Sequence, residues 1–467
     1  MPRVTTVVIV GGGPGGYEAA LVGRQLGAEV TVIHRDGLGG SAVLTDCVPS
    51  KALVATANVI TAAASSASLG VRINGQTPEP ALVGVDLAEV NQRISRLATA
   101  QSTDIAGRLD REGIRVISGT GSLDAGGQVT VAHPDGSRET IAPDVILLAT
   151  GARPRVLAQA QPDGERILTW EQVYDLPAVP ERLIVVGSGV TGAEFAGAYH
   201  ALGGRVVLIS SRDRVLPSED PDAARVLEEV YGRRGLEVLS RSRALAARRT
   251  ADGVEVTLST GDVVTGSHVL MAVGSLPNTD DLGLAEAGVD RDDRGFIKVD
   301  RVSRTSRRGV YAAGDCTGVL MLASVAAMQG RIAMWHALGD AVTPLDLTTV
   351  SSTVFTNPEI ATVGLTQADL DAGRFRGDAV TVPLAPNARA KMEDHTDGFV
   401  KLFCRRGSRI VAGAVIVSPH ASELIHPLTI AVEQRLTVDQ LASTFTVYPS
   451  LSGSIAEAAR RLHIAAE

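Results

Sequence analysis

The chain contains two GxGxxG turns, and each lies between an apolar strand and a helix. In the first, an apolar strand at 7–10 leads into Gly11, Gly13 and Gly16, and an alanine-rich helix and a second strand at 30–33 follow. This strand–turn–helix–strand context is the fingerprint of a dinucleotide-binding unit. The first glycine allows a tight bend, the second lets the backbone approach a pyrophosphate, and the third packs the helix against the strand.

The second turn repeats this design further along the chain. A strand at 183–186 leads into Gly187, Gly189 and Gly192, then into a helix through Ala198 and a strand at 205–209. The N–H groups and the dipole at the start of each helix favour phosphate. We therefore predict an α/β fold with two Rossmann-like domains that bind two dinucleotides.

Composition narrows the class of protein. The 467 residues include 49 glycines, and 45% of them are apolar and 21% charged, which is typical of a folded enzyme. The formal charge of -8 argues against a nucleic-acid partner, because such a partner requires a basic surface. The basic run 301–308 is interpreted as a solvated loop.

The sequence also predicts a cytoplasmic location. No segment approaches about 18 uninterrupted apolar residues, so we expect no integral membrane segment. Met1-Pro2-Arg3 leads directly into the first strand, so we expect no signal peptide. The three cysteines, Cys47, Cys316 and Cys404, are widely spaced and give neither a disulfide framework nor a CxxC metal pair. We expect no metal site.

The chain resembles the flavoprotein disulfide reductases along almost its whole length. Residues 39–51 match the redox-active stretch of that family, Gly-Gly-Thr-Cys-x4-Cys-x-Pro-Ser-Lys, except at Ser41 and Ala42. Matching landmarks follow in the family's order: Ala149-Thr150-Gly151, Gly274 to Asn278, Gly309 to Asp315, and the segment 354–364.

The resemblance implies three domains. An FAD-binding domain would comprise 1–152 and 275–345, an NAD(P)-binding domain 153–274, and an α+β interface domain 346–467. The family's interface domain implies a homodimer.

Three positions of the family's thiol mechanism depart from its pattern. Ala42 stands at the first cysteine of the redox pair, whose second member is Cys47. Near the C-terminus, Tyr448 and Gly453 stand where the family has a histidine base and the glutamate that orients it. A phenol with a pKa of about 10 does not act as a base at neutral pH as imidazole does. A thiol, a base and a carboxylate of one mechanism are therefore missing together.

The resemblance also assigns candidate FAD ligands. Gly11, Gly13, Gly16 and Ser41 would hold the pyrophosphate, and Asp315 would accept hydrogen bonds from flavin hydroxyls. Either His34, which replaces an expected acid, or Asp36 would bind the adenosine ribose. The remaining candidates are Gly121 near adenine, Thr150 of the Ala-Thr-Gly turn, and Ala323, whose helix N-terminus would face the flavin ring.

Lys51 and Glu194 form the predicted catalytic pair. The resemblance implies that Lys51 lies beside flavin N5 and that Glu194, two residues past Gly192, holds it. A fixed cation there favours hydride transfer. Cys47 is either a thiol packed on the flavin or an inert buried one.

NADPH, NADH or both are the expected electron donors. An acid for the ribose 2′-OH is expected after the second strand, but Ser210 stands there, followed by Ser211, Arg212 and Arg214. Without the acid nothing repels a 2′-phosphate, and two arginines attract it. Gly274 is a further candidate residue for binding NAD(P)H.

The favoured hypothesis is an FAD-dependent NAD(P)H oxidoreductase that reduces a quinone or a similar small acceptor without disulfide chemistry. The chain most resembles the lipoamide-dehydrogenase-like NAD(P)H:quinone reductases that lack the cysteine pair. The alternatives are a soluble pyridine-nucleotide transhydrogenase and a flavin-binding dimer without turnover.

Overall fold

The computed structural model describes residues 3–78 and 83–464. Within them the chain forms two compact units. The first takes its residues from Met1–Ala52, Asn91–Arg155 and Gly274–Asp346, and the second from Leu53–Val90, Val156–Val273 and Leu347–Glu467. The predicted three-domain division stays a prediction.

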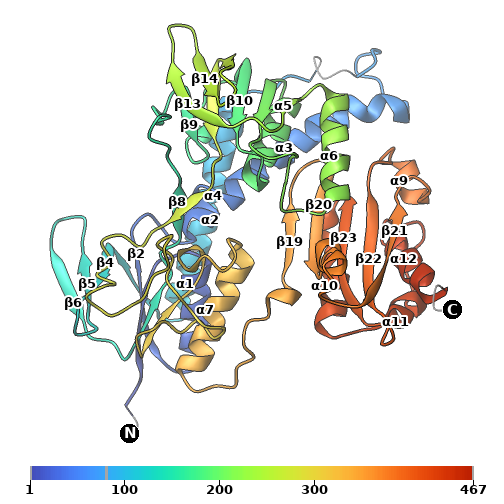
Figure 1. The fold of residues 1–467 in the computed structure, drawn as a ribbon. Helices are drawn as coiled ribbons and strands as arrows, with labels where there is room; N and C mark the ends of the chain where they lie inside the picture. Colours follow the sequence, from blue (N-terminus) through green and yellow to red (C-terminus); the bar gives the residue numbers. More distant parts are fainter. Residues whose placement is uncertain (1–2, 79–82, 465–467) are drawn as a thin grey trace. The chain divides into compact units, whose positions relative to one another are not determined.

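The first unit is built on a parallel sheet of five strands in the order β18-β7-β1-β2-β3 (Figure 1). The strands are β1 (Thr6–Val10), β2 (Glu29–His34), β3 (Arg115–Ser118), β7 (Val145–Leu148) and β18 (Val310–Ala312). Each pairs with its neighbour in parallel register, as the repeated strand–helix–strand pattern predicts.

The two faces of this sheet are covered differently. In β1, Val7 and Ile9 pack in the cluster that includes helix α1 (Pro14–Gln25) and helix α7 (Ala323–Ala337). The alternate residues Val8 and Val10 pack in a second cluster with a three-stranded antiparallel sheet. That sheet consists of β4 (Thr120–Leu123), β5 (Val129–Ala132) and β6 (Arg138–Ile141). The period of two along a strand thus fills both layers.

The second unit contains the second nucleotide-type sheet, in the order β12-β11-β10-β16-β9. Its parallel strands are β9 (Ile167–Thr169), β10 (Arg182–Val186), β11 (Arg205–Ile209), β12 (Glu237–Leu239) and β16 (His268–Met271). Helix α5 (Val190–Ala201) follows the second GxGxxG turn, and helix α6 (Pro221–Arg234) connects β11 to β12. The predicted α/β fold class is confirmed.

The same unit holds a five-stranded antiparallel sheet, shown in orange in Figure 1. Its strands are β19 (Ser351–Val354), β20 (Glu359–Gly364), β21 (Gly377–Pro383), β22 (Phe399–Arg405) and β23 (Val411–Ser418). Helices α10 (Ala421–Glu433) and α12 (Gly453–Ile464) pack in one hydrophobic cluster with Val400 and Leu402 of β22. The intervening Lys401 therefore points to the opposite face of the sheet.

One stretch of the described residues, Gly40–Leu69, is long and apolar enough to span a membrane by length and composition. The sequence-based expectation considered only uninterrupted apolar runs and so missed it. Leu53, Ala57 and Ile60 in this stretch are buried, with the spacing of one helical face. Core helices of soluble proteins pass the same test, so the stretch is weak evidence for a membrane span.

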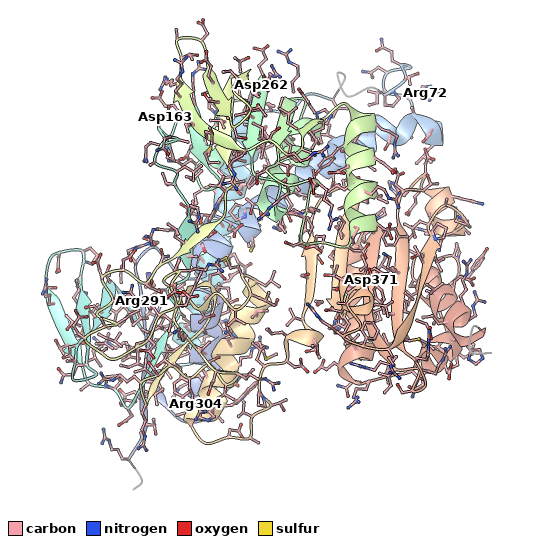
Figure 2. All side chains as sticks on the ribbon, in the orientation of Figure 1. Arg72, Asp163, Asp262, Arg291, Arg304 and Asp371 are labelled. Atoms are coloured by element: carbon pink, nitrogen blue, oxygen red, sulfur yellow. The ribbon has the colours of Figure 1, made fainter. Side chains whose placement is uncertain are left out.

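The basic run 301–308 forms the predicted loop, and Arg301, Arg304 and Arg307 in it make hydrogen bonds to the protein. Arg304 Nε donates to Asp300 Oδ2 at 2.6 Å, and Arg307 Nη1 donates to the Ala287 carbonyl at 2.5 Å. Figure 2 shows Arg304 at the surface of the first unit. These contacts engage the guanidinium groups with the fold itself.

Candidate functional site: two dinucleotide turns

The first turn requires glycine at two of its three predicted positions. Gly11 has φ +122°, and a Cβ there would lie 2.0 Å from the Ala149 carbonyl oxygen. A Cβ on Gly16 would lie 1.9 Å from the Gly11 carbonyl oxygen. Gly13 differs, because the nearest atoms to its Cβ position lie 4.0 Å away. Gly11 and Gly16 thus shape the turn, and Gly13 leaves an open backbone surface.

A second glycine loop lies against this turn. The Gly39 N–H donates to the Gly12 carbonyl at 2.8 Å, and a Cβ on Gly40 would lie 2.8 Å from Gly13 Cα. Ser41 follows in the short helix α2 (Gly40–Leu44). Backbone from two segments therefore meets around Gly13 without side chains, as a pyrophosphate cradle requires.

His34 carries a buried polar atom that suits a ligand. It ends β2, and its Nδ1 is buried with no hydrogen-bond partner among the described residues. Burial lowers the pKa of His34, so the imidazole is neutral at pH 7. Asp36 is instead bonded by its neighbour Arg35 at 2.8–3.0 Å. Of the two candidates for the adenosine ribose hydroxyl of FAD, His34 fits better. A ribose hydroxyl would supply the hydrogen-bond partner that its buried Nδ1 lacks among the described residues.

Asp315 lies in the short helix that follows β18. Burial, together with the nearby Asp46 carboxylate, raises its pKa to about 6. Hydrogen bonds donated by a ligand to the Asp315 carboxylate would offset the free-energy cost of burying its charge. The turn before it is fixed by Gln329, whose Oε1 accepts the Gly314 N–H at 2.9 Å. Sequence reasoning missed Gln329, because nothing in an amide inside a helix indicates this contact.

The other candidates of the FAD group are placed by local contacts. Thr150 Oγ1 donates to the Asn278 carbonyl at 2.6 Å, and Asn278 Nδ2 donates to the Thr150 carbonyl at 3.0 Å. A Cβ on Gly121 would lie 3.0 Å from Val10 Cγ1, so packing already explains that glycine. Ala323 is the first residue of α7, whose N-terminus carries the positive end of its dipole.

The residues of the redox stretch lie on two consecutive helices. Ala42 is in α2, and Cys47 and Lys51 are in the first turns of α3 (Cys47–Ser65). Glu194 is in α5, is 3% exposed, and accepts the Phe355 N–H at 2.8 Å. Lys51 and Glu194 belong to different compact units, so their pairing stays a prediction.

The other two cysteines are buried and unreactive. The Cys316 thiol lies 3.3 Å from the Ala313 carbonyl oxygen, and burial raises the pKa of Cys316 to about 11. Burial also raises the pKa of Cys404 in β22. A thiol protonated at neutral pH is neither a nucleophile nor a redox partner. None of the three cysteines, all of which lie in the described part of the chain, forms a disulfide.

The second turn repeats the geometry of the first. Gly187 has φ +110°, and a Cβ there would lie 2.1 Å from the Ala272 carbonyl oxygen. A Cβ on Gly192 would lie 1.8 Å from the Gly187 carbonyl oxygen, whereas Gly189 has no described atom within 4 Å of its Cβ position. Gly274 lies in the other unit, where its carbonyl accepts the Arg155 N–H. Its predicted nucleotide contact stays a prediction.

The candidate residues that follow β11 differ in their exposure to solvent. Ser210 is fully buried, and its hydroxyl lies 2.6 Å from that of Ser188 in the turn. Ser211 and Arg212 are exposed. Arg214 Nη2 donates to the Pro217 carbonyl at 3.2 Å, and its Nε is buried without a partner among the described residues. Ser210 therefore positions the loop, and its side chain is not accessible to a nucleotide.

At the C-terminal positions of the missing base, Tyr448 is 86% exposed and Gly453 begins α12. The neighbouring Phe445 and Val447 are also highly exposed, at 102% and 77%. These three side chains leave apolar area exposed to water.

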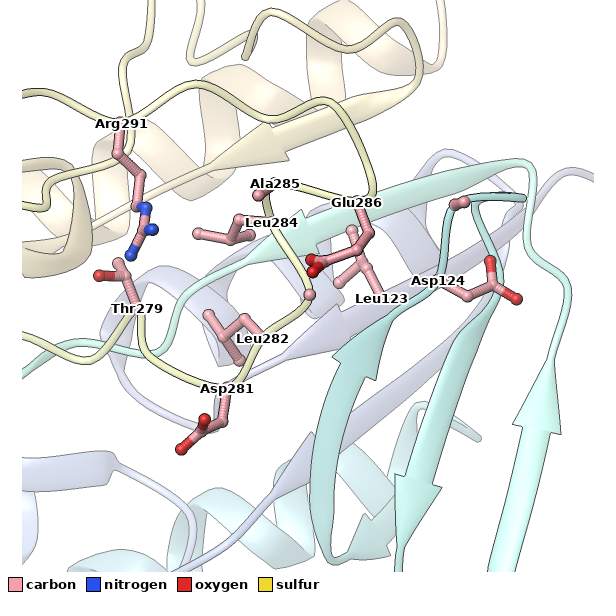
Figure 3. Close-up of a pocket in the computed structure, with 11 residues that line it drawn as sticks. Leu123, Asp124, Thr279, Asp281, Leu282, Leu284, Ala285, Glu286 and Arg291 are labelled. Carbon is pink, nitrogen blue, oxygen red and sulfur yellow. The ribbon is translucent and has the colours of Figure 1, made fainter.

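A surface hollow of about 650 Å³ lies elsewhere in the first unit (Figure 3). Leu123, Leu282 and Leu284 line it, and Arg291 points its guanidinium toward Thr279. Asp124, Asp281 and Glu286 add negative charge; Asp281, Glu286 and Arg291 are exposed, and Asp124 is half-buried. Exposed charges of both signs do not select one class of ligand.

Comparison with known proteins identifies close relatives. Residues 5–330 match the family described as "Pyridine nucleotide-disulphide oxidoreductase", and residues 350–459 match its dimerisation domain. The chain is 53% identical to the "NAD(P)H dehydrogenase (quinone)" of Mycobacterium tuberculosis strain H37Rv, over 98% of this chain and 94% of that protein. It is 33% identical to "Dihydrolipoyl dehydrogenase 2" of Haloarcula marismortui, over 97% and 96% of the two chains.

Solved structures agree with these matches. The crystal structure of LpdA from Mycobacterium tuberculosis superposes with a TM-score of 0.94 at 52% identity, covering 98% of this chain and 100% of that one. The flavoprotein disulfide reductase RclA from Escherichia coli, at 22% identity and a TM-score of 0.86, shares the fold.

Proposed function

Because the chain belongs to the pyridine nucleotide-disulphide oxidoreductase family, we propose that it is an FAD-dependent NAD(P)H:quinone oxidoreductase without disulfide reductase activity. The family uses FAD and a nicotinamide nucleotide, and the chain is an NAD(P)H oxidoreductase. The acceptor is proposed from the quinone named for relatives at 53% identity. The cytoplasmic location remains a prediction.

The observation that carries the proposal is the missing sulfur at Ala42. A disulfide reductase needs two thiols that form and break one S–S bond. Only Cys47 stands in the redox stretch, and Cys316 and Cys404 are buried with raised pKa values. No second reactive thiol is therefore offered to a disulfide substrate within the described residues.

The residues present fit FAD on the grounds of the open Gly13–Gly40 cradle and the orphan nitrogen of His34. When bound, FAD supplies a two-electron carrier that accepts hydride from a nicotinamide and releases electrons one or two at a time. Gly11, Gly13, Gly16 and Ser41 would hold its pyrophosphate. Thr150, Asp315 and Ala323 lie on the same first unit.

The proposed catalytic work of the protein is electrostatic. Lys51 would provide a fixed positive charge where negative charge develops during hydride transfer. Glu194 would position that ammonium group, and the Phe355 N–H in turn fixes one of its carboxylate oxygens. Gly187, Gly189 and Gly192 would hold the pyrophosphate of NAD(P)H.

A homodimer belongs to the same proposal. The dimerisation domain covers 350–459, and the exposed Phe445, Val447 and Tyr448 lie within it. Burying this surface against a second copy would remove the apolar area from water. A tyrosine in place of a histidine base suits a reaction that needs no thiol deprotonation.

The test is steady-state oxidation of NADPH by the FAD-loaded protein, with a benzoquinone or with lipoamide as acceptor. We expect turnover with the quinone and none with lipoamide. K51M should lower kcat with quinone by about 100-fold, the effect of removing one group that stabilises developing charge. K298M, which removes an exposed lysine, is the matched control and should be as active as the wild type.

Turnover with lipoamide at a comparable rate would overturn the proposal. Reduction of thio-NAD by NADPH at a rate above that of quinone would favour a transhydrogenase instead. A bound flavin that NADPH does not reduce would indicate a dimer without turnover.

A further inference from the structure

Two segments of the second unit, besides its own helix α5, hold Glu194. Its Oε1 accepts the Phe355 N–H at 2.8 Å, and Phe355 lies directly after β19. The carbonyl of the preceding residue, Ala193, accepts the Tyr231 hydroxyl at 2.7 Å, and Tyr231 is a buried residue of α6. A Cβ on Gly197 would lie 2.8 Å from this hydroxyl, so glycine there lets α6 approach α5. The backbone and the carboxylate of Glu194 are thus fixed from two sides.

Helix α6 also holds the loop that contains Phe355. At the end of α6, Arg234 Nη1 donates to the Asn357 carbonyl and Arg234 Nη2 donates to Asn357 Oδ1, both at 3.0 Å. These bonds are charge-assisted, and the planar guanidinium fixes the two acceptors relative to each other. Part of the Arg234 side chain is exposed, but both of these donors bind the loop. Arg234 therefore holds the backbone two residues from the N–H that binds Glu194.

The contacts between α5, α6 and the 355–357 loop form a closed ring. His200 Nε2, in the last turn of α5, lies 2.7 Å from the Arg234 carbonyl. Because a carbonyl only accepts, this nitrogen carries the proton and donates. Asn357 Nδ2 donates to Asn58 Oδ1 of α3 at 2.9 Å, so the loop is also tied to a third helix. The position of the loop therefore depends on Asn357 and Arg234 together.

We propose that Arg234 and Asn357 are positioning residues for the Glu194 carboxylate. The inference rests on the proposed function, in which Glu194 positions the ammonium group of Lys51. Arg234 and Asn357 act through the Phe355 N–H, whose place they set. Small displacements of a catalytic group lower a rate constant even when the substituted residue lies away from the reacting atoms.

This role separates the rate of hydride transfer from the binding of the nucleotide. Glu194 lies two residues past Gly192, the third glycine of the turn that would hold the NAD(P)H pyrophosphate. A substitution that distorted α5 as a whole would disturb that turn and weaken NADPH binding. A substitution that only displaces the carboxylate would lower the rate constant at saturating NADPH and leave the dissociation constant unchanged.

The experiment is anaerobic stopped-flow reduction of the FAD-loaded protein by NADPH, followed by the loss of flavin absorbance. In R234M the rate constant at saturating NADPH should fall about tenfold, and the dissociation constant of NADPH should change less than about twofold. N357A should lower the rate constant by a smaller factor, because the Arg234 bond to the backbone carbonyl is kept.

R233M is the matched control. Arg233 precedes Arg234 in α6, is 56% exposed, and forms an ion pair with Asp397. The same substitution one residue earlier removes the same charge and also a contact of α6 with the C-terminal part of the second unit. Its partner lies outside the 355–357 loop, so R233M should have the wild-type rate constant.

Combination with E194Q distinguishes positioning of the carboxylate from a general structural role. Because Arg234 acts through that carboxylate, R234M should lower the rate constant by less than about twofold in an E194Q background. A structural role predicts the same loss in both backgrounds. The unfolding temperatures of the four FAD-loaded proteins give a readout without catalysis. The loss in the double variant should be smaller than the sum of the two single losses, because both substitutions weaken the support of one loop.

An R234M protein with the wild-type rate constant, an equal loss in R233M, or additive losses with E194Q would overturn the inference. The assay needs no quinone, so normal results here without quinone turnover would contradict only the proposed acceptor. A wild-type flavin that NADPH does not reduce would contradict the proposed function. The unfolding temperatures would then still decide whether Arg234 and Glu194 are coupled.

Discussion

At the scale of single residues, the environment changes what a side chain does. Asp315 begins the short helix that follows β18 and lies near Asp46, and burial raises its pKa to about 6. In the unfolded chain the pKa returns to about 3.9. The folded protein therefore holds this proton more tightly than the unfolded chain does. Stability from this group is present below about pH 4 and is lost as the pH rises toward 6 and above.

We predict opposite effects of D315N on stability and on FAD binding. At pH 8 the FAD-free variant should be more stable than the FAD-free wild type, by up to about 3 kcal/mol for a shift of about two pKa units. At pH 4 the two should be equal. The FAD-loaded variant should release FAD at least tenfold more readily, because a charged acceptor is lost. Thermal unfolding from pH 4 to 8 and the absorbance of retained flavin measure both effects.

A lower unfolding temperature for FAD-free D315N at pH 8 would contradict this account of Asp315. Unchanged flavin retention would remove Asp315 from the proposed FAD site.

At the scale of elements, different glycines of a GxGxxG turn are needed for folding and for nucleotide binding. Gly192 lets α5 pack against the Gly187 carbonyl, and nothing larger fits there. Gly189 has φ −72°, which any residue adopts, and open space at its Cβ position. Packing within the described residues therefore does not require glycine at this second position, and its role in nucleotide binding stays a prediction.

We therefore predict that G192A and G189A fail in different ways. G192A should destabilise the protein by about 3 kcal/mol or more, since its Cβ would clash with rigid backbone. G189A should unfold within about 0.5 kcal/mol of the wild type but should raise KM for NADPH severalfold with the quinone assay. Thermal unfolding and steady-state kinetics distinguish the two. Equal stability of both variants would contradict the steric argument.

At the scale of the whole molecule, a buried cation joins helix α6 to the C-terminal sheet within the second unit. Lys401 Nζ lies 2.8 Å from Asp220 Oδ2 and 2.7 Å from Asp222 Oδ2, and Lys401 and Asp220 are both almost fully buried. Asp220 caps α6 of the nucleotide-binding part, and Lys401 lies in β22 of the C-terminal sheet. The hydrogen bond from Lys401 is the main cause of the lowered pKa of Asp222.

We predict that K401M destabilises the protein by about 3–5 kcal/mol at pH 7, because it leaves a buried carboxylate uncompensated. K391M, which removes an exposed lysine of helix α9 (Ala388–Met392), should have no measurable effect. K401M/D220N should recover part of the loss, since the unpaired charge is gone. Differential scanning calorimetry measures all three, and a neutral K401M would show that the buried pair is dispensable.

The sequence by itself determined the parts of this protein that follow local rules. Glycine spacing and apolar runs located both strand–turn–helix–strand units, because a tight turn and a close backbone approach exclude other residues. The missing sulfur at Ala42 could be read directly from the aligned stretch. Tertiary structure alone decided that Ser210 is buried, that Arg234 binds Asn357, and that Lys401 pairs with Asp220. Each depends on segments distant in sequence that the fold brings within hydrogen-bond distance, and no local pattern encodes such a contact.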